Sequence, residues 1–187
     1  MWIFLIVVLI AVILLYPYVS VAVFRYKAIV SLRLKLRRVG GRMRVLRRFA
    51  FASSNRSSKY DLLVEKDNVF YAVKFWSCVH RNNSLRICSD GRVCEERLSS
   101  PPLTPKGPVK QRAVRYRAKY VPKTQYRFKN PSGKKIINVA LVYPSYKNII
   151  LDRDGEEAIL KSGDQFFDKV ILTPLAFGKI LSKKTES

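Results

Sequence analysis

The fold is decided at residues 1–24, MWIFLIVVLIAVILLYPYVSVAVF, where no side chain carries a charge and nearly all residues are aliphatic or aromatic. A helix rises about 1.5 Å per residue, so about 20 apolar residues cross the roughly 30 Å hydrocarbon core of a bilayer. Trp2 near one end and Tyr16 and Tyr18 near the other suit the headgroup level, and Pro17 is expected to kink the helix. The sequence therefore predicts a transmembrane helix over residues 1–24.

The charges around this helix predict its orientation. No Lys or Arg precedes it, whereas Arg25 and Lys27 follow at once. The positive-inside rule then places the N-terminus outside and the rest of the chain in the cytoplasm, as a single-pass protein of the cell membrane. Two alternatives are a cleaved signal peptide, for which Ser20-Val21-Ala22 offers small residues, and a core helix of a soluble domain. A signal peptide has a basic segment before a shorter apolar core, and soluble cores rarely hold so long an uncharged run.

The part after residue 24 carries the entire net charge of +23, so we expect it to meet an anionic partner. No Asp or Glu occurs before Asp61. Residues 25–52 are therefore predicted to form a basic juxtamembrane helical arm. Apolar residues at helical spacing carry a helix to Val39, Gly40-Gly41 end or bend it, and a second short helical segment is expected over residues 42–52.

The basic arm is a candidate site for anionic lipid. Each Lys or Arg near an anionic leaflet contributes about 1 kcal/mol, within a Debye length of about 8 Å. The same charges also serve to fix the topology, which is the simpler interpretation. The candidate lipid-binding residues are Arg25, Lys27, Arg33, Lys35, Arg37 and Arg38.

Beyond the arm the pattern changes from helical to strand-like. Residues 53–59 are polar and are predicted to be a linker, and residues 60–182 are predicted to form one cytoplasmic α+β domain with a mixed, mostly antiparallel sheet and a C-terminal helix. Hairpin signals lie at residues 66–68, 89–91 and 154–155, and residues 136–143 are apolar enough for a central strand. A Pro-rich loop covers residues 99–108, Thr173-Pro174 are expected to start the last helix, and residues 183–187 form a tail.

Asp61, followed by ten residues and then Ala72-Val73-Lys74, resembles the PD-(D/E)xK pattern of the restriction-endonuclease-like fold. This resemblance implies an acid and a lysine on adjacent strands of a hairpin, where they would meet at a divalent metal. Asp61 and Lys74 match the pattern, and they are the candidate catalytic residues. Ala72 replaces the middle acid, so the resemblance implies an inactive relative. The chain also resembles small membrane-anchored bacterial proteins, a likeness that implies no activity.

Aromatic side chains are interleaved with the basic residues of residues 112–135. Single-stranded nucleic acid is bound without sequence preference where bases stack on aromatic rings while Lys and Arg hold phosphates. A solvated basic surface and a lipid contact predict a similar composition. The candidate nucleic-acid-binding residues are Arg115, Tyr116, Arg117, Tyr120, Tyr126 and Arg127.

Other chemistry is not indicated. Three cysteines without a disulfide-framework spacing agree with a reducing compartment. A zinc site would need Cys78, His80, Cys88 and Cys94 to converge, and their spacing lacks the paired ligands of zinc modules. No metal or cofactor is predicted. We therefore expect a non-enzymatic, membrane-anchored module that contacts anionic lipid, nucleic acid or an acidic protein, with an inactive nuclease-like domain as the alternative.

Overall fold

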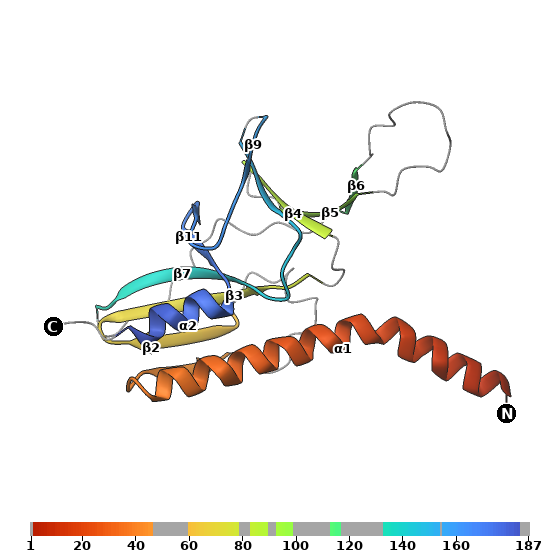
Figure 1. Ribbon diagram of the computed structural model, residues 1–187, viewed down its shortest axis with the longest axis horizontal. Coiled ribbons are helices and arrows are strands. Elements are labelled where there is room, and N and C mark those ends of the chain that lie inside the picture. Colours follow the sequence, from red (N-terminus) through yellow and green to blue (C-terminus); the bar gives the residue numbers. More distant parts are fainter. Residues whose placement is uncertain are drawn as a thin grey trace.

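The computed structural model describes residues 2–46, 60–78, 83–89, 93–98, 113–116, 133–153 and 155–183. Helix α1 (Trp2–Arg37) is long and apolar enough to cross a membrane by its length and composition, and none of its most apolar 18-residue window is buried. It runs without interruption from the apolar segment into the basic one. Figure 1 shows that α1 bends in its N-terminal half, where Pro17 removes a backbone donor from the helix.

The strands form two sheets that lie one above the other (Figure 1). The six-stranded sheet has the order β1-β2-β3-β7-β11-β10, and the five-stranded sheet has the order β6-β5-β4-β8-β9. The strands are β1 (Arg42–Val45), β2 (Leu62–Lys66), β3 (Val69–Trp76), β4 (Asn83–Cys88), β5 (Val93–Leu98), β6 (Ala113–Tyr116), β7 (Lys135–Val142), β8 (Ile149–Arg153), β9 (Glu156–Ile159), β10 (Gln165–Phe166) and β11 (Lys169–Leu172).

Two apolar clusters hold these layers together. In the first, Leu32 and Leu36 of α1 and Phe177 of α2 (Pro174–Ser182) pack on one face of the six-stranded sheet. In the second, Trp76 and Ile171, from the opposite face of that sheet, pack against the five-stranded sheet. The order of layers is therefore helices, six-stranded sheet, five-stranded sheet. The basic end of α1 is one of these layers, not an arm separate from the domain.

The fold class is confirmed as α+β, with mixed sheets in which antiparallel pairs predominate and with a short C-terminal helix. β2 and β3 form the expected antiparallel hairpin. β7 lies between β3 and β11, as expected for the most apolar strand, and it pairs in parallel with both. Thr173 caps α2 by accepting a hydrogen bond from the backbone N–H of Ala176 at 3.2 Å.

The second helical segment predicted over residues 42–52 is wrong at residues 42–45, because β1 occupies Arg42–Val45 and pairs antiparallel with β2. Gly40 takes a φ of +72°, which ends α1 and turns the chain back. At Gly41 a Cβ would lie 2.4 Å from Leu36 Cδ1 and 2.9 Å from the backbone oxygen of Glu65, so only glycine fits this close approach. Residues 47–59, which hold the predicted linker, and loop 99–108 lie outside the described residues, as do tail residues 184–187.

Candidate functional site

The basic residues of α1 divide into an exposed group and a buried one. Lys35 is half-buried, with its ammonium over Gly178 of α2, where a Cβ would lie 2.7 Å from Lys35 Nζ. Arg25 is buried, so it does not belong to the exposed surface that we predicted to bind anionic lipid. We call the following exposed residues of α1 and β1 the basic face: Lys27, Arg33, Arg37, Arg38, Arg42 and Arg44.

Arg25 joins α1 to the ends of the sheet strands. Its Nε–H donates to Ser77 Oγ at 2.6 Å, and its guanidinium lies 5.7 Å from the ring centroid of Phe75. Burial lowers the pKa of Arg25, while the charge of Asp61 acts in the opposite direction. One turn of helix is thereby held against the sheet by a charged hydrogen bond as well as by apolar contacts. Sequence analysis missed this role because a basic residue after an apolar run also suits the membrane surface.

Asp61, which precedes β2, and Lys74 of β3 lie side by side. Lys74 Nζ is 3.7 Å from Asp61 Oδ2, and both side chains are buried. Asp61 Oδ2 also accepts the backbone N–H of Phe75 at 2.8 Å, whereas Asp61 Oδ1 is buried without a hydrogen-bond partner. Within the described ranges, no group of three His, Cys, Asp or Glu side chains is placed to hold a metal ion.

A polar row that the sequence analysis did not single out lies next to Ala72 on the same sheet. Asn138 of β7 is the register partner of Ala72, and its Nδ2 donates to Asp168 Oδ2 at 2.9 Å. Tyr60 donates its hydroxyl to Asn138 Oδ1 at 2.7 Å. Burial, followed by the charge of Asp168, raises the pKa of Tyr60 to about 12. The sequence feature that could have indicated this polar row is Asn138 itself, a polar residue within the apolar run at residues 136–143.

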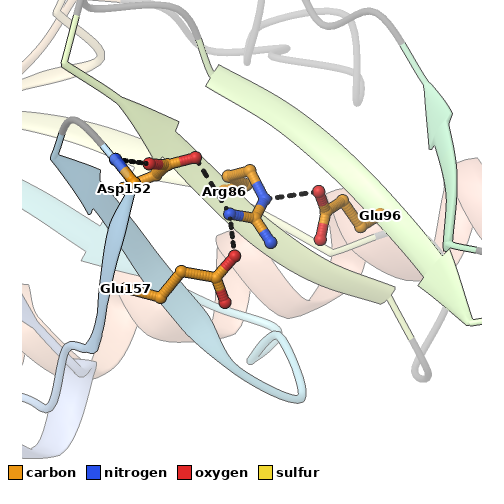
Figure 2. A network of polar contacts seen from close by, with 5 residues as sticks. Arg86, Glu96, Asp152 and Glu157 are labelled. Atoms are coloured by element: carbon orange, nitrogen blue, oxygen red, sulfur yellow. Dashed lines mark hydrogen bonds and ion pairs between the residues drawn. The ribbon is translucent and has the colours of Figure 1, made fainter.

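Arg86 is the centre of an ion cluster in the five-stranded sheet (Figure 2). Its guanidinium bonds Glu96 of β5 through Nε, and through Nη1 it reaches Asp152 at 3.1 Å and Glu157 at 2.6 Å. Burial acts to lower the pKa of Arg86, but the hydrogen bonds to Glu96 and Glu157 outweigh it and raise that pKa. One cation among three carboxylates gives this cluster a net charge of −2.

The remaining candidate residues do not form a site among the described residues. Arg115 and Tyr116 lie in β6, the strand at one edge of the five-stranded sheet. Arg117, Tyr120, Tyr126 and Arg127 lie outside the described residues, and so does His80. Cys78 is buried, Cys88 and Cys94 are half-buried, and all three remain thiols.

Comparisons with protein-family models, with curated proteins and with solved structures find no match for this chain.

Proposed function

We propose that this protein is a non-enzymatic, membrane-anchored module that contacts anionic lipid headgroups through the basic face. The observation that carries the proposal is the continuity of α1. One helix holds the exposed apolar segment and, beginning at Lys27, the exposed cations. If the membrane surface crosses α1 near residue 24, Lys27 lies about 5 Å beyond it along the helix, within a Debye length of about 8 Å. Arg33, Arg37 and Arg38 lie about 14–21 Å along the helix and approach the lipid when α1 tilts toward the surface. The positive-inside rule favours a cytoplasmic domain.

The distribution of acidic residues supports the same proposal. The residues of the basic face lie in α1 and β1, and neither element contains Asp or Glu. The cluster around Arg86 lies in the five-stranded sheet, on the other side of the six-stranded sheet from α1 (Figure 1). The basic face can therefore approach an anionic surface without repulsion from carboxylates of its own segments.

A fragment of residues 18–187 tests the proposal. It keeps every buried residue of α1, the first of which is Val21, and so it retains both apolar clusters. We expect it to sediment with vesicles of equal parts phosphatidylglycerol and phosphatidylcholine at low salt, and to be released in 1 M salt, where the Debye length is about 3 Å. Gln at Lys27, Arg33, Arg37 and Arg38 should abolish this binding.

The matched control removes the same number of exposed cations elsewhere, with Gln at Lys147, Arg153, Lys161 and Lys179. It should bind like the unmodified fragment. Equal loss in both variants would show a response to net charge alone and would contradict the proposal. If the fragment bound a labelled single strand of nucleic acid but not the vesicles, the partner of the basic residues would be nucleic acid and not lipid.

A second candidate function is an inactive nuclease-like domain, which is favoured by the pairing of Asp61 with Lys74 at 3.7 Å. Ala72 offers no carboxylate, and the buried ion pair leaves the lysine engaged. We expect no cleavage of labelled DNA in Mg²⁺ by the full chain in detergent. Cleavage that is lost in Lys74→Met, with binding retained, would contradict the non-enzymatic assignment.

A further inference from the structure

The basic half of α1 is apolar on two opposite sides. One side is buried against the six-stranded sheet through Val21, Arg25, Ala28, Leu32 and Leu36. At about 100° of rotation per residue, the mean direction of Val23, Val30 and Leu34 lies about 180° from that of the buried residues. These three side chains are 46%, 37% and 54% exposed, and Tyr26 beside them is 68% exposed. We call Val23, Tyr26, Val30 and Leu34 the outer stripe.

Cations flank the outer stripe on both sides. By the same rotation, Arg33 lies on one flank, and Lys27 and Arg38 lie on the other, while Arg37, which follows Leu34 by three residues, points with the stripe and ends it. A shallow groove of about 420 Å³ follows the stripe, and its lining combines stripe residues with Lys27, Ser31, Lys35 and Arg38. A helix on the outside of a soluble domain normally has polar residues opposite its buried side. An apolar stripe between Lys and Arg is instead the pattern of a helix that lies in the bilayer interface.

Two observations identify what covers the stripe. First, the stripe continues the exposed apolar surface of α1, since Val19 and Val12 point in the same direction and are 51% and 57% exposed. Second, Figure 1 shows the N-terminal part of α1 bending away from the two sheets, toward the side of the helix that the sheets leave open. We therefore expect the membrane segment and the outer stripe to contact the same lipid bilayer.

We infer that the basic half of α1, residues 21–38, tilts toward the bilayer surface, with the outer stripe facing the acyl boundary and Lys27, Arg33 and Arg38 facing the phosphates. The inference rests on the proposed membrane anchoring. Residues 2–20, which precede the first buried residue, extend about 28 Å as a helix and suffice to cross the hydrocarbon core. The bend in α1 tilts the following residues so that their outer stripe faces the lipid, and the two sheets stack on the side of α1 away from it (Figure 1).

Spin labels on the full chain in lipid nanodiscs test this geometry. In a background of Cys88→Ser and Cys94→Ser, with Cys78 buried, one label replaces Leu34 through Leu34→Cys and another replaces Ile159 of β9 through Ile159→Cys. Both native side chains are more than half exposed, so neither label disturbs the core. Nanodiscs contain either phosphatidylcholine alone or equal parts phosphatidylcholine and phosphatidylglycerol.

The label at residue 34 should collide with oxygen severalfold more often than with a water-soluble nickel complex, and the label at residue 159 should show the reverse. Equal nickel access at both residues in both lipid mixtures would overturn the inference. Shielding of residue 34 from both reagents would place protein on the stripe and would also overturn it. The oxygen pattern at residue 34 in phosphatidylcholine alone would support docking while contradicting the anionic preference proposed above.

Discussion

Arg25 of α1 and Ser77, which follows β3, are joined by a hydrogen bond of 2.6 Å between residues that are 52 positions apart in the chain. Both side chains are buried, and Ser77 Oγ in turn donates to the backbone oxygen of Tyr143 at 2.6 Å. Beside this contact, the rings of Phe24 and Tyr143 meet edge to face at 5.8 Å. The end of the exposed apolar segment is thus tied to the ends of two central strands, which couples the position of α1 to that of the sheet.

The first prediction concerns this tie. Arg25→Met keeps most of the buried volume but removes the charged hydrogen bond to Ser77, and hydrogen bonds to charged groups are worth about 1.5–3 kcal/mol. We expect the free energy of unfolding of fragment 18–187 in urea to fall by about 2 kcal/mol. Lys27→Met, two residues further along the exposed side, should change it by less than about 0.5 kcal/mol. Equal effects of the two substitutions would contradict the anchoring role of Arg25.

The second prediction concerns the buried pair of Asp61 and Lys74. Lys74→Met removes the ammonium that lies 3.7 Å from Asp61 and leaves a buried carboxylate whose Oδ1 already has no hydrogen-bond partner. Breaking a buried pair from one side costs about 3–5 kcal/mol. The combination of Lys74→Met with Asp61→Asn should recover part of this loss, which a double-mutant cycle in urea measures. Strict additivity of the two losses would show that the residues do not interact.

The third prediction concerns pH. Tyr60 has a pKa of about 12 in the folded protein and an ordinary value of about 10 when unfolded. The unfolded chain therefore loses this proton first as the pH rises, so the stabilisation is complete below pH 10 and is lost between about pH 10 and 12. Two pKa units correspond to about 2–3 kcal/mol. Urea unfolding at a series of pH values measures this slope.

Tyr60→Phe provides the control, because Tyr71 and Tyr146 also have raised pKa values through burial. Tyr60→Phe should remove the contribution of Tyr60 to the pH dependence of the free energy of unfolding, while the contributions of Tyr71 and Tyr146 remain. At neutral pH it should cost about 1 kcal/mol, since Asn138 Oδ1 loses its donor. A slope identical to that of the unmodified protein would contradict the assignment.

The fourth prediction concerns the turn between α1 and β1. Gly41→Ala would place a methyl group 2.4 Å from Leu36 Cδ1 and 2.9 Å from a backbone oxygen, which forces the chain to shift and is expected to cost about 1–3 kcal/mol. Gly40→Ala meets no atom within 4 Å but strains a φ of +72°, at about 1 kcal/mol. Thermal unfolding should therefore rank Gly41→Ala below Gly40→Ala, and the opposite order would contradict the close approach at Gly41.

The turn between α1 and β1 shows which features could be predicted from the sequence and which could not. Gly40-Gly41 marked the end of the helix correctly, and the turn residues at 66–68, 89–91 and 154–155 marked the hairpins, because both are local signals. Met43, Leu46 and Phe49 have the spacing of a helix, whereas Met43 and Val45 have the spacing of a strand, and only pairing with β2 selects the strand. Likewise, the burial of Arg25 depends on Ser77, and the polar row depends on Tyr60 meeting Asn138, partners that are far apart in the chain. Such contacts are set by tertiary structure and leave no local pattern.

The last prediction concerns Arg86 in the five-stranded sheet. Its guanidinium joins strands β4, β5, β8 and β9 through Glu96, Asp152 and Glu157, so Arg86→Met leaves three carboxylates that repel one another around an uncompensated site (Figure 2). We expect a loss of about 3–5 kcal/mol near pH 7. Adding Glu157→Gln to Arg86→Met should recover part of that loss, because it removes one of the three negative charges. Arg153→Met, an exposed arginine on the same strand as Asp152, should not show the loss. A loss in Arg86→Met that Glu157→Gln does not reduce would mean that packing of the arginine stem, and not its charge, holds these four strands together.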